Sequence, residues 1–322
     1  MKNSDTPDAM VERVLKGDFR AIARLLTLVE NGSNEAIPHL RELFAHTGHC
    51  FSIGVTGSPG AGKSTFVDGL TDWYRLQQKK VGIIAVDPTS PFTGGAILGD
   101  RIRMQSRCVD PGTFIRSMAT RGHIGGVTLA TSDFLIVMDA AGFDIVIIET
   151  VGVGQGEVEI AKMANATVLL LVPGMGDDIQ AMKAGIMEIG DIYAINKADH
   201  PGADRTEAEL NALLSMSSRA DGWKPPVIRT IASQGTGIEA CAGAIEEYRS
   251  FLSTSDIRRA LAIQAQKERL LELACMQARE ALLQDTAKAA RIEELAVLIA
   301  DRKLDPFSAA EEVLQLHLLD SE

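Results

Sequence analysis

Residues 57–65 read Gly-Ser-Pro-Gly-Ala-Gly-Lys-Ser-Thr (GSPGAGKST), and they follow the apolar run FSIGV at residues 51–55. This is the pattern G-x-x-x-x-G-K-[ST] between a predicted strand and a predicted helix, the context in which it indicates a nucleoside triphosphate site. Glycines let the backbone curl so that successive N–H groups point at phosphate oxygens, and the helix start adds the positive end of its dipole. We therefore expect phosphate contacts from Gly57, Ser58, Pro59, Gly60, Ala61, Gly62, Lys63, Ser64 and Thr65.

Outward from this segment, predicted strands and helices alternate from residue 51 to about residue 250. Several of the strand candidates are continuously apolar, as strands buried on both faces should be. The pattern predicts an α/β fold of the P-loop NTPase type, a mostly parallel sheet flanked by helices that binds ligands at the carboxyl ends of its strands. The strand candidates are Phe51–Val55, Val81–Val86, Thr113–Arg116, Ile145–Glu149, Ala166–Val172, Ile192–Asn196 and Val227–Thr230.

The segment Asn196-Lys197-Ala198-Asp199 follows one of these strands and has the pattern N-K-x-D. A carboxylate at Asp199 can accept from guanine N1–H and the exocyclic amino group together, whereas adenine offers no such pair of donors. We expect Asn196 to tie this segment to the phosphate loop and Lys197 to lie along the base plane. Backbone N–H groups for guanine O6 are expected from Ile231, Ala232 and Ser233. The predicted ligands are GTP and GDP.

Catalysis and metal binding are predicted around the phosphates. Lys63 is expected to bridge the β- and γ-phosphates, and the Ser64 hydroxyl is expected to bind Mg²⁺. Glu149 ends a predicted strand, where an acidic residue holds Mg²⁺ or orients the attacking water, and the Gly152 N–H can meet the γ-phosphate.

Further acidic residues occur in glycine-rich stretches after other strands. Asp87 and Asp100 lie in DPTSPFTGGAILGDRIRM (residues 87–104) and are candidate Mg²⁺ ligands, directly or through water. The segment 173–183 is another glycine- and acid-rich loop at the expected ligand edge. The predicted catalytic residues are thus Lys63, Glu149 and Asp87, and the predicted metal ligands are Ser64, Asp87, Asp100 and Glu149.

Composition excludes several other classes. The chain of 322 residues has 32 Lys and Arg against 43 Asp and Glu, a net charge of −11 that disfavours nucleic-acid binding. The four cysteines form no C-x-x-C pair, so we expect reduced core thiols rather than a zinc site or disulfides. The histidines fall in different segments and support no ligand role. Without an apolar leader or a membrane-spanning run, the sequence predicts a cytoplasmic enzyme that meets no membrane.

Helical segments are predicted on both sides of the core. Residues 8–46 have helical periodicity with a break at 31–33, and the chain from residue 256 onward is again helical. In the C-terminal part we expect a second helix near 288–300, a break at Asp305-Pro306 and a short helix from Ser308. Because the C-terminal arm has an apolar stripe, it needs a partner, and a second copy of the chain is the simplest one.

Taken together, these motifs resemble the MeaB/ArgK group of P-loop GTPases, chaperones associated with methylmalonyl-CoA mutase. The resemblance covers nearly the whole chain and is most specific in six segments. These are residues 57–65, 87–104, 149–157 (ETVGVGQGE), 173–183, 196–199 and 305–314 (DPFSAAEEVL). The corresponding domains are an N-terminal helical extension (1–48), a P-loop GTPase domain (49–253) and a C-terminal helical dimerisation arm (254–322).

The resemblance implies a homodimer and slow intrinsic GTP hydrolysis that a partner accelerates. It implies that the partner is an adenosylcobalamin-dependent acyl-CoA mutase, whose cofactor loading and protection the GTPase gates. It places Asp87, Asp100 and Glu149 at the family's Mg²⁺ and switch positions, and Lys183 in the loop that communicates with the mutase. Ile231 departs from the small polar residue expected there, a change that backbone contacts would survive.

Three alternative functions are also considered. One is a kinase linked to amino-acid transport, which the guanine pattern and the lack of an H-R-D-type loop disfavour. Another is a nickel-delivery GTPase, for which this chain has no His-rich or C-x-x-C segment. The last is a GTP-sensing scaffold without hydrolytic activity.

Overall fold

The computed structural model describes residues 7–88, 110–120, 126–150, 163–174, 189–216, 219, 221–254 and 257–318. Asp100, Gly152 and Lys183, for which the sequence predicts roles, lie outside these residues. The chain divides into two compact units, Met1–Leu261 and Ala262–Glu322.

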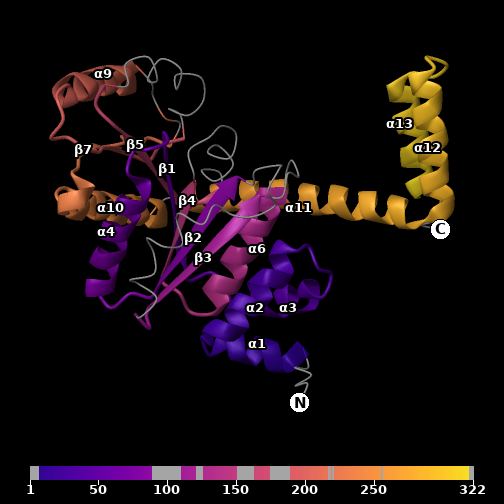
Figure 1. The fold of residues 1–322 in the computed structure, drawn as a ribbon, viewed down its shortest axis with the longest axis horizontal. Helices are drawn as coiled ribbons and strands as arrows, with labels where there is room; N and C mark the ends of the chain where they lie inside the picture. The colour runs from indigo at the N-terminus through magenta and orange to yellow at the C-terminus, as the bar shows by residue number, and fades with distance from the viewer. Residues whose placement is uncertain are drawn as a thin grey trace. The chain divides into compact units, whose positions relative to one another are not determined.

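The first unit is built on a seven-stranded parallel sheet with the order β3-β2-β4-β1-β5-β6-β7 (Figure 1). All seven predicted strands are present, and the α/β P-loop NTPase fold is confirmed. The largest difference from expectation is β3, which continues to Thr120 because it pairs with β2 up to Pro88. The strands are β1 (Phe51–Gly57), β2 (Val81–Pro88), β3 (Thr113–Thr120), β4 (Ile145–Thr150), β5 (Ala166–Leu171), β6 (Ile192–Ile195) and β7 (Val227–Arg229).

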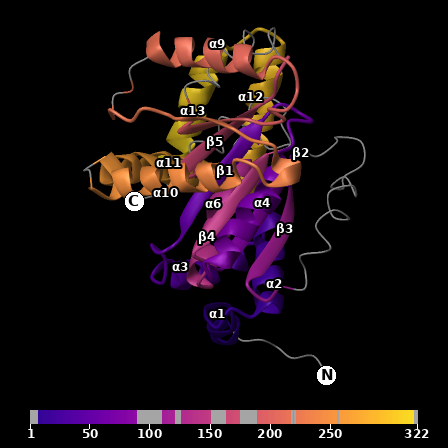
Figure 2. The same ribbon diagram turned by 90° about the vertical axis from the view of Figure 1, so that its left-hand side faces the viewer.

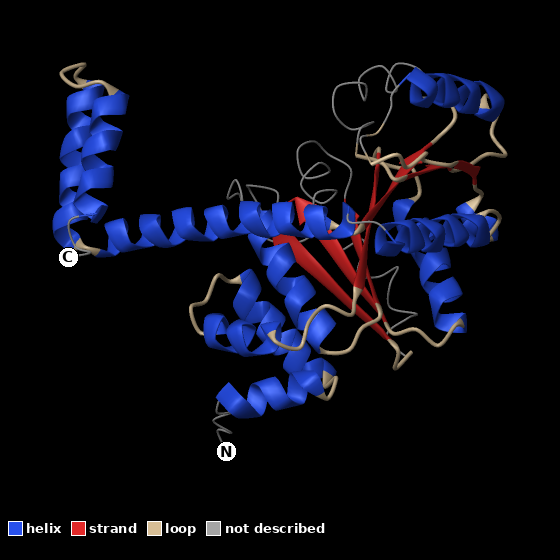
Figure 3. Cartoon of the chain, turned by 180° about the vertical axis from the view of Figure 1, so that it is seen from behind, coloured by secondary structure: helices blue, strands red, loops and turns tan. Residues whose placement is uncertain are grey.

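Helices cover both faces of the sheet, because alternate side chains of each strand point to opposite faces. Helices α4 (Lys63–Leu76) and α10 (Ile238–Thr254) cover one face. On the other face, α6 (Gly126–Ala140) packs over β2–β4, and α9 (Ala203–Met216) packs over β5–β7. Figure 3 shows the strands gathered in one sheet with helices on either side.

The N-terminal helices share a core with α6 and the sheet (Figure 2). They are α1 (Pro7–Leu15), α2 (Phe19–Glu30) and α3 (Ala36–Phe44). The expected break at 31–33 is present, and a second break that the sequence did not predict separates α1 from α2. There Gly17 has a φ of 74°, and the Asp18 carboxylate caps α2 by accepting from the N–H groups of Arg20 and Ala21.

An aromatic contact and an ion pair connect α2 to the edge strand β3. The Phe19 and Phe114 rings meet edge to face with centroids 5.3 Å apart. The Arg116 guanidinium donates to the Glu30 carboxylate at 2.6 Å. The N-terminal helices therefore cover the edge strand as well as α6.

Helix α11 (Ile257–Gln284) begins in the first unit and continues into the second unit, which starts at Ala262. The second unit also contains α12 (Thr286–Ala300) and α13 (Pro306–Leu318). Helix α13 begins two residues before the predicted Ser308. Asp305 caps it by accepting from the N–H groups of Phe307 and Ser308, and proline is tolerated in a first helical turn. Helices α12 and α13 pack together, and the Arg291–Glu312 ion pair links them at 2.7 Å.

No helix within the described ranges combines the length and the apolar character needed to cross a bilayer.

Candidate functional site

The phosphate loop connects β1 to α4 at the carboxyl edge of the sheet, and its glycines are required by geometry. Gly57 has a φ of 145°, and a Cβ there would collide with the Leu170 carbonyl oxygen. Gly62 caps α4 with a φ of 89°, and a Cβ there would lie 2.5 Å from the Asn196 amide nitrogen. The loop can therefore approach its neighbours only as bare backbone.

Lys63, the first residue of α4, lies against this loop. Its Nζ donates to the carbonyl oxygens of Gly57 at 2.6 Å and Ser58 at 3.0 Å, and the residue is 6% exposed. The ammonium group is thus held within the turn expected to surround the phosphates.

Ser64 and Glu149 meet beside Lys63. The Ser64 hydroxyl donates to Glu149 Oε1 at 2.6 Å, and Glu149 is 7% exposed near the end of β4. Two predicted Mg²⁺ ligands, one on α4 and one on a central strand, therefore lie together. A hydroxyl and a carboxylate are oxygen ligands of the kind that Mg²⁺ prefers, so these residues fit that ion.

Asn196 joins the N-K-x-D segment to two other loops. Its Nδ2 donates to the Ala61 carbonyl oxygen at 2.7 Å, which is the expected link to the phosphate loop. Its Oδ1 accepts from the Thr230 hydroxyl at 3.1 Å and from the Ala232 N–H at 3.0 Å. Because Asn196 is only 2% exposed, the phosphate loop and both predicted base-binding segments are held by one buried amide.

Lys197 adds a second link to the phosphate loop. Its Nζ donates to the Gly60 carbonyl oxygen at 2.9 Å, and its backbone has a φ of 54°. This left-handed conformation is uncommon for a residue with a side chain, so the surrounding contacts must maintain it. Asp199 is exposed two residues later.

The last predicted base-binding segment forms a short turn after β7. The Ile231 N–H donates to the Thr236 carbonyl oxygen at 3.0 Å, so it is engaged within the turn. Ala232 is buried and begins a 3₁₀ turn through Gln234, and Ser233 is exposed. Which N–H group meets guanine O6 stays a prediction.

Asp87 is the next-to-last residue of β2, and its backbone lies opposite Ala119 of β3, at the same carboxyl edge of the sheet.

Three buried threonines at this edge were not predicted from the sequence: Thr56, Thr150 and Thr230. Each lies directly beside a predicted motif, and that position next to a motif is the sequence feature that could have indicated them.

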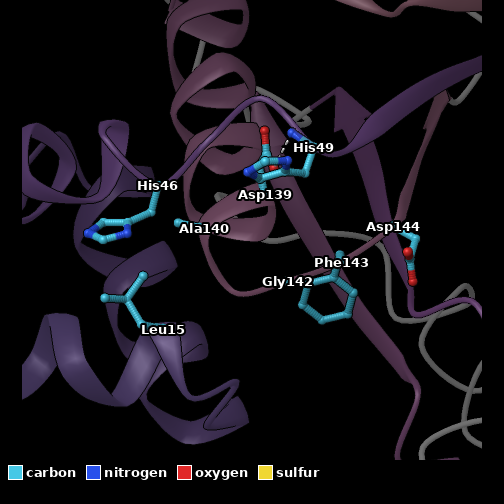
Figure 4. A pocket seen from close by; sticks show the side chains of 8 residues that line it. All are labelled: Leu15, His46, His49, Asp139, Ala140, Gly142, Phe143 and Asp144. Atoms are coloured by element: carbon cyan, nitrogen blue, oxygen red, sulfur yellow. Dashed lines mark hydrogen bonds between the residues drawn. The ribbon is translucent and has the colours of Figure 1, made fainter.

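A separate pocket lies at the amino-terminal edge of the sheet (Figure 4). The Asp139 carboxylate beside it accepts from the backbone N–H groups of Gly48, His49 and Cys50 at 2.6, 3.1 and 3.0 Å. Asp139 therefore holds the segment that enters β1. The pocket is lined by Leu15, His46, His49, Asp139, Ala140, Gly142, Phe143 and Asp144.

The cysteines differ in environment, and none of the three described is in a disulfide. Cys241 is buried and Cys50 is half-buried, and burial raises the pKa of both thiols. Cys275 on α11 is exposed, so the expectation of a core thiol is wrong there, because α11 exposes much of its surface. Across the described ranges, no three His, Cys, Asp or Glu side chains gather as a metal site.

The fold and the phosphate loop define the class: a P-loop nucleoside triphosphatase. A family model, "Methylmalonyl Co-A mutase-associated GTPase MeaB", matches residues 22–291. A putative GTPase of Pyrococcus abyssi is 48% identical over 96% of both chains. The "Methylmalonic aciduria type A homolog, mitochondrial" of Caenorhabditis elegans is 36% identical over 78% of this chain and 68% of its own length.

A solved structure, "Crystal structure of LAO/AO transport system kinase", matches 98% of this chain and 99% of its own with a TM-score of 0.72 and 25% identity. The chain belongs to the MeaB family of P-loop GTPases. It binds guanine nucleotide and hydrolyses GTP to GDP and phosphate.

Proposed function

We propose that this GTPase is a chaperone that gates cofactor loading and protection of an adenosylcobalamin-dependent acyl-CoA mutase of the methylmalonyl-CoA mutase type. The match of the MeaB family model over residues 22–291 is the observation that carries this proposal. The name of the relative from Caenorhabditis elegans supports it. We further propose that the protein acts in the cytoplasm.

In this proposal the phosphate site combines three described side chains. Lys63 neutralises charge on the β- and γ-phosphates, because its Nζ already lies inside the phosphate loop. Ser64 and Glu149 hold Mg²⁺, with Asp87 and Asp100 contributing directly or through water and Gly152 meeting the γ-phosphate. Mg²⁺, when bound, would supply positive charge that neutralises the phosphate oxygens.

The guanine site is proposed on the segments that Asn196 joins. Asp199 accepts from the two guanine donors, Lys197 lies along the base, and the turn 231–233 meets O6 through a backbone N–H group. Asn196 and Lys197 bond to the phosphate loop, and Asn196 also accepts from the Ala232 N–H. The Asn196 contacts support this arrangement because they fix the base-binding segments relative to the phosphate loop.

We also propose that two copies of the chain pair through the C-terminal arm of the 254–322 domain, with 1–48 as the helical extension and 49–253 as the GTPase domain. The support is the number of large apolar side chains that the second unit exposes, because burying them requires a partner surface. They are Ile263, Leu270, Leu271, Met276, Leu283, Val297, Phe307 and Leu314.

Steady-state GTP hydrolysis by the purified chain, measured with and without a purified adenosylcobalamin-dependent methylmalonyl-CoA mutase, tests the proposed role. We expect slow turnover of GTP that rises when the mutase is added, and no turnover of ATP. GTP turnover that does not change when the mutase is added would refute the proposed partner, and equal turnover of ATP would favour the kinase alternative.

Light scattering of the free chain, which measures its mass in solution, tests the proposed dimer.

A further inference from the structure

Two buried threonines lie where the phosphate loop and the Glu149 strand diverge. Thr56 precedes Gly57, and Thr150 follows Glu149. The threonines are 1% and 4% exposed, and the Thr150 hydroxyl donates to the Thr56 hydroxyl oxygen at 3.1 Å. The backbone register between β1 and β4 ends at Val55 and Glu149, so this bond continues the pairing one residue further.

The threonine pair and the Glu149 carboxylate lie on opposite faces of the sheet. Alternate side chains of a strand face opposite ways. Ile147 packs in the core under α4, and Ile148 packs in the core under α6. Glu149 therefore faces α4, where it accepts from Ser64, and Thr150 faces the α6 side, where it bonds to Thr56. The end of β4 is thus held from both faces.

We propose that the Thr56–Thr150 hydrogen bond positions Glu149 relative to the phosphate loop for GTP hydrolysis. This inference rests on the proposed role of Glu149 at the phosphate site. Both threonines are positioning residues, because they act through the ends of β1 and β4. Catalytic groups tolerate little misplacement, since a shift of about 1 Å can cost about a hundredfold in rate.

The first test replaces Thr150 with valine, which has nearly the same shape and no hydroxyl. We expect T150V to lower kcat about tenfold while KM for GTP changes by less than about twofold, because positioning rather than nucleotide binding is lost. T150S should restore kcat because it keeps the donor. T131V is the matched control: Thr131 is fully buried on α6, and its hydroxyl contacts the Met118 sulfur at 3.9 Å. Wild-type kcat in T150V would overturn the proposal.

A double variant separates positioning from stability. T150V leaves the buried Thr56 hydroxyl without that donor and should lower Tm, whereas T56V/T150V removes both hydroxyls and should recover Tm. If the hydrogen bond positions Glu149, kcat of the double variant stays low although Tm recovers. If kcat recovers together with Tm, the pair is only structural and the proposal fails.

E149Q distinguishes this inference from the role on which it rests. We expect E149Q to lose hydrolysis while it still binds GTP. Wild-type hydrolysis by E149Q would refute the proposed role of Glu149 in hydrolysis. It would also refute the proposal that the threonine pair positions Glu149 for that role. An inactive E149Q beside a fully active T150V would refute the positioning alone.

Discussion

The two edges of the sheet use polar side chains in different ways. At the carboxyl edge, the Asn196 amide and the Lys63 ammonium bond to loops that the sequence predicts to hold a nucleotide. At the amino edge, carboxylates bond to the backbone where strands begin. Asp139 accepts from the segment before β1, Asp144 from the Lys80 N–H before β2, and Asp191 from the Thr167 N–H of β5.

The difference shows how one fold separates stability from function. At the amino edge, the Asp139 carboxylate accepts from three backbone N–H groups at once, so these bonds stabilise the start of β1. Asp191 is buried, and desolvation raises its pKa even though Arg219 lies 2.9 Å away. Carboxyl-edge bonds instead join Lys63 and Asn196 to the loops that are expected to hold the nucleotide. Substitutions at the two edges should therefore have different consequences.

The largest expected effect is at the carboxyl edge. K63A should lower kcat/KM for GTP by about a hundredfold or more, because the charge on the β- and γ-phosphates is left without its cation. Steady-state hydrolysis and fluorescent-nucleotide binding measure the loss. K16A is the control and should behave as wild type, because Lys16 follows α1 directly and forms an exposed ion pair with Glu12. Normal GTP turnover by K63A would contradict the assignment of residues 57–65 as the phosphate loop.

Guanine selection should be the next largest effect. D199N should reduce the preference for GTP over ATP by roughly ten- to a hundredfold, because an amide cannot accept from both guanine donors. Competition binding with GTP and ATP measures the ratio. D204N nearby is the control, since that side chain is 91% exposed. An unchanged ratio in D199N would contradict the predicted role of the N-K-x-D segment.

At the amino edge the effect should be on stability. D139A should lower the free energy of unfolding by about 1–3 kcal/mol, because three backbone N–H groups lose their acceptor. Urea denaturation measures the loss, and R205A in an exposed i,i+4 pair is the control. The folded fraction of D139A should keep wild-type GTP turnover. A large drop in kcat without a loss of stability would contradict the division between the two edges.

The smallest effect should appear as pH dependence. Asp110 precedes β3 and accepts from Arg75, and that hydrogen bond holds the pKa of its carboxyl below the usual range. A depressed pKa stabilises the folded state above the unfolded-state pKa of about 3.9, and the gain disappears as pH falls toward the folded-state pKa. D110N should therefore be less stable than wild type at pH 7, and the difference should shrink below about pH 4. Thermal unfolding from pH 7 to pH 3 tests this, and a constant difference would contradict it.

Much of the carboxyl edge could be predicted from the sequence. The GSPGAGKST and NKAD segments are contiguous, and each follows an apolar strand, so the fold class and the expected Asn196 link could be inferred without coordinates. The amino edge could not be predicted in the same way. Nothing in the sequence near Asp139 indicates that its carboxylate accepts hydrogen bonds from the backbone N–H groups of residues 48–50.

The sequence by itself determined the parallel α/β fold, the phosphate loop and the guanine-type segment, because each depends on residues close together in the chain. Only the tertiary structure decided that the N-terminal helices share a core with α6, and that Thr56 meets Thr150. The physical reason is strand order. A parallel sheet places β1 between β4 and β5, so its side-chain contacts come from segments far away in the chain.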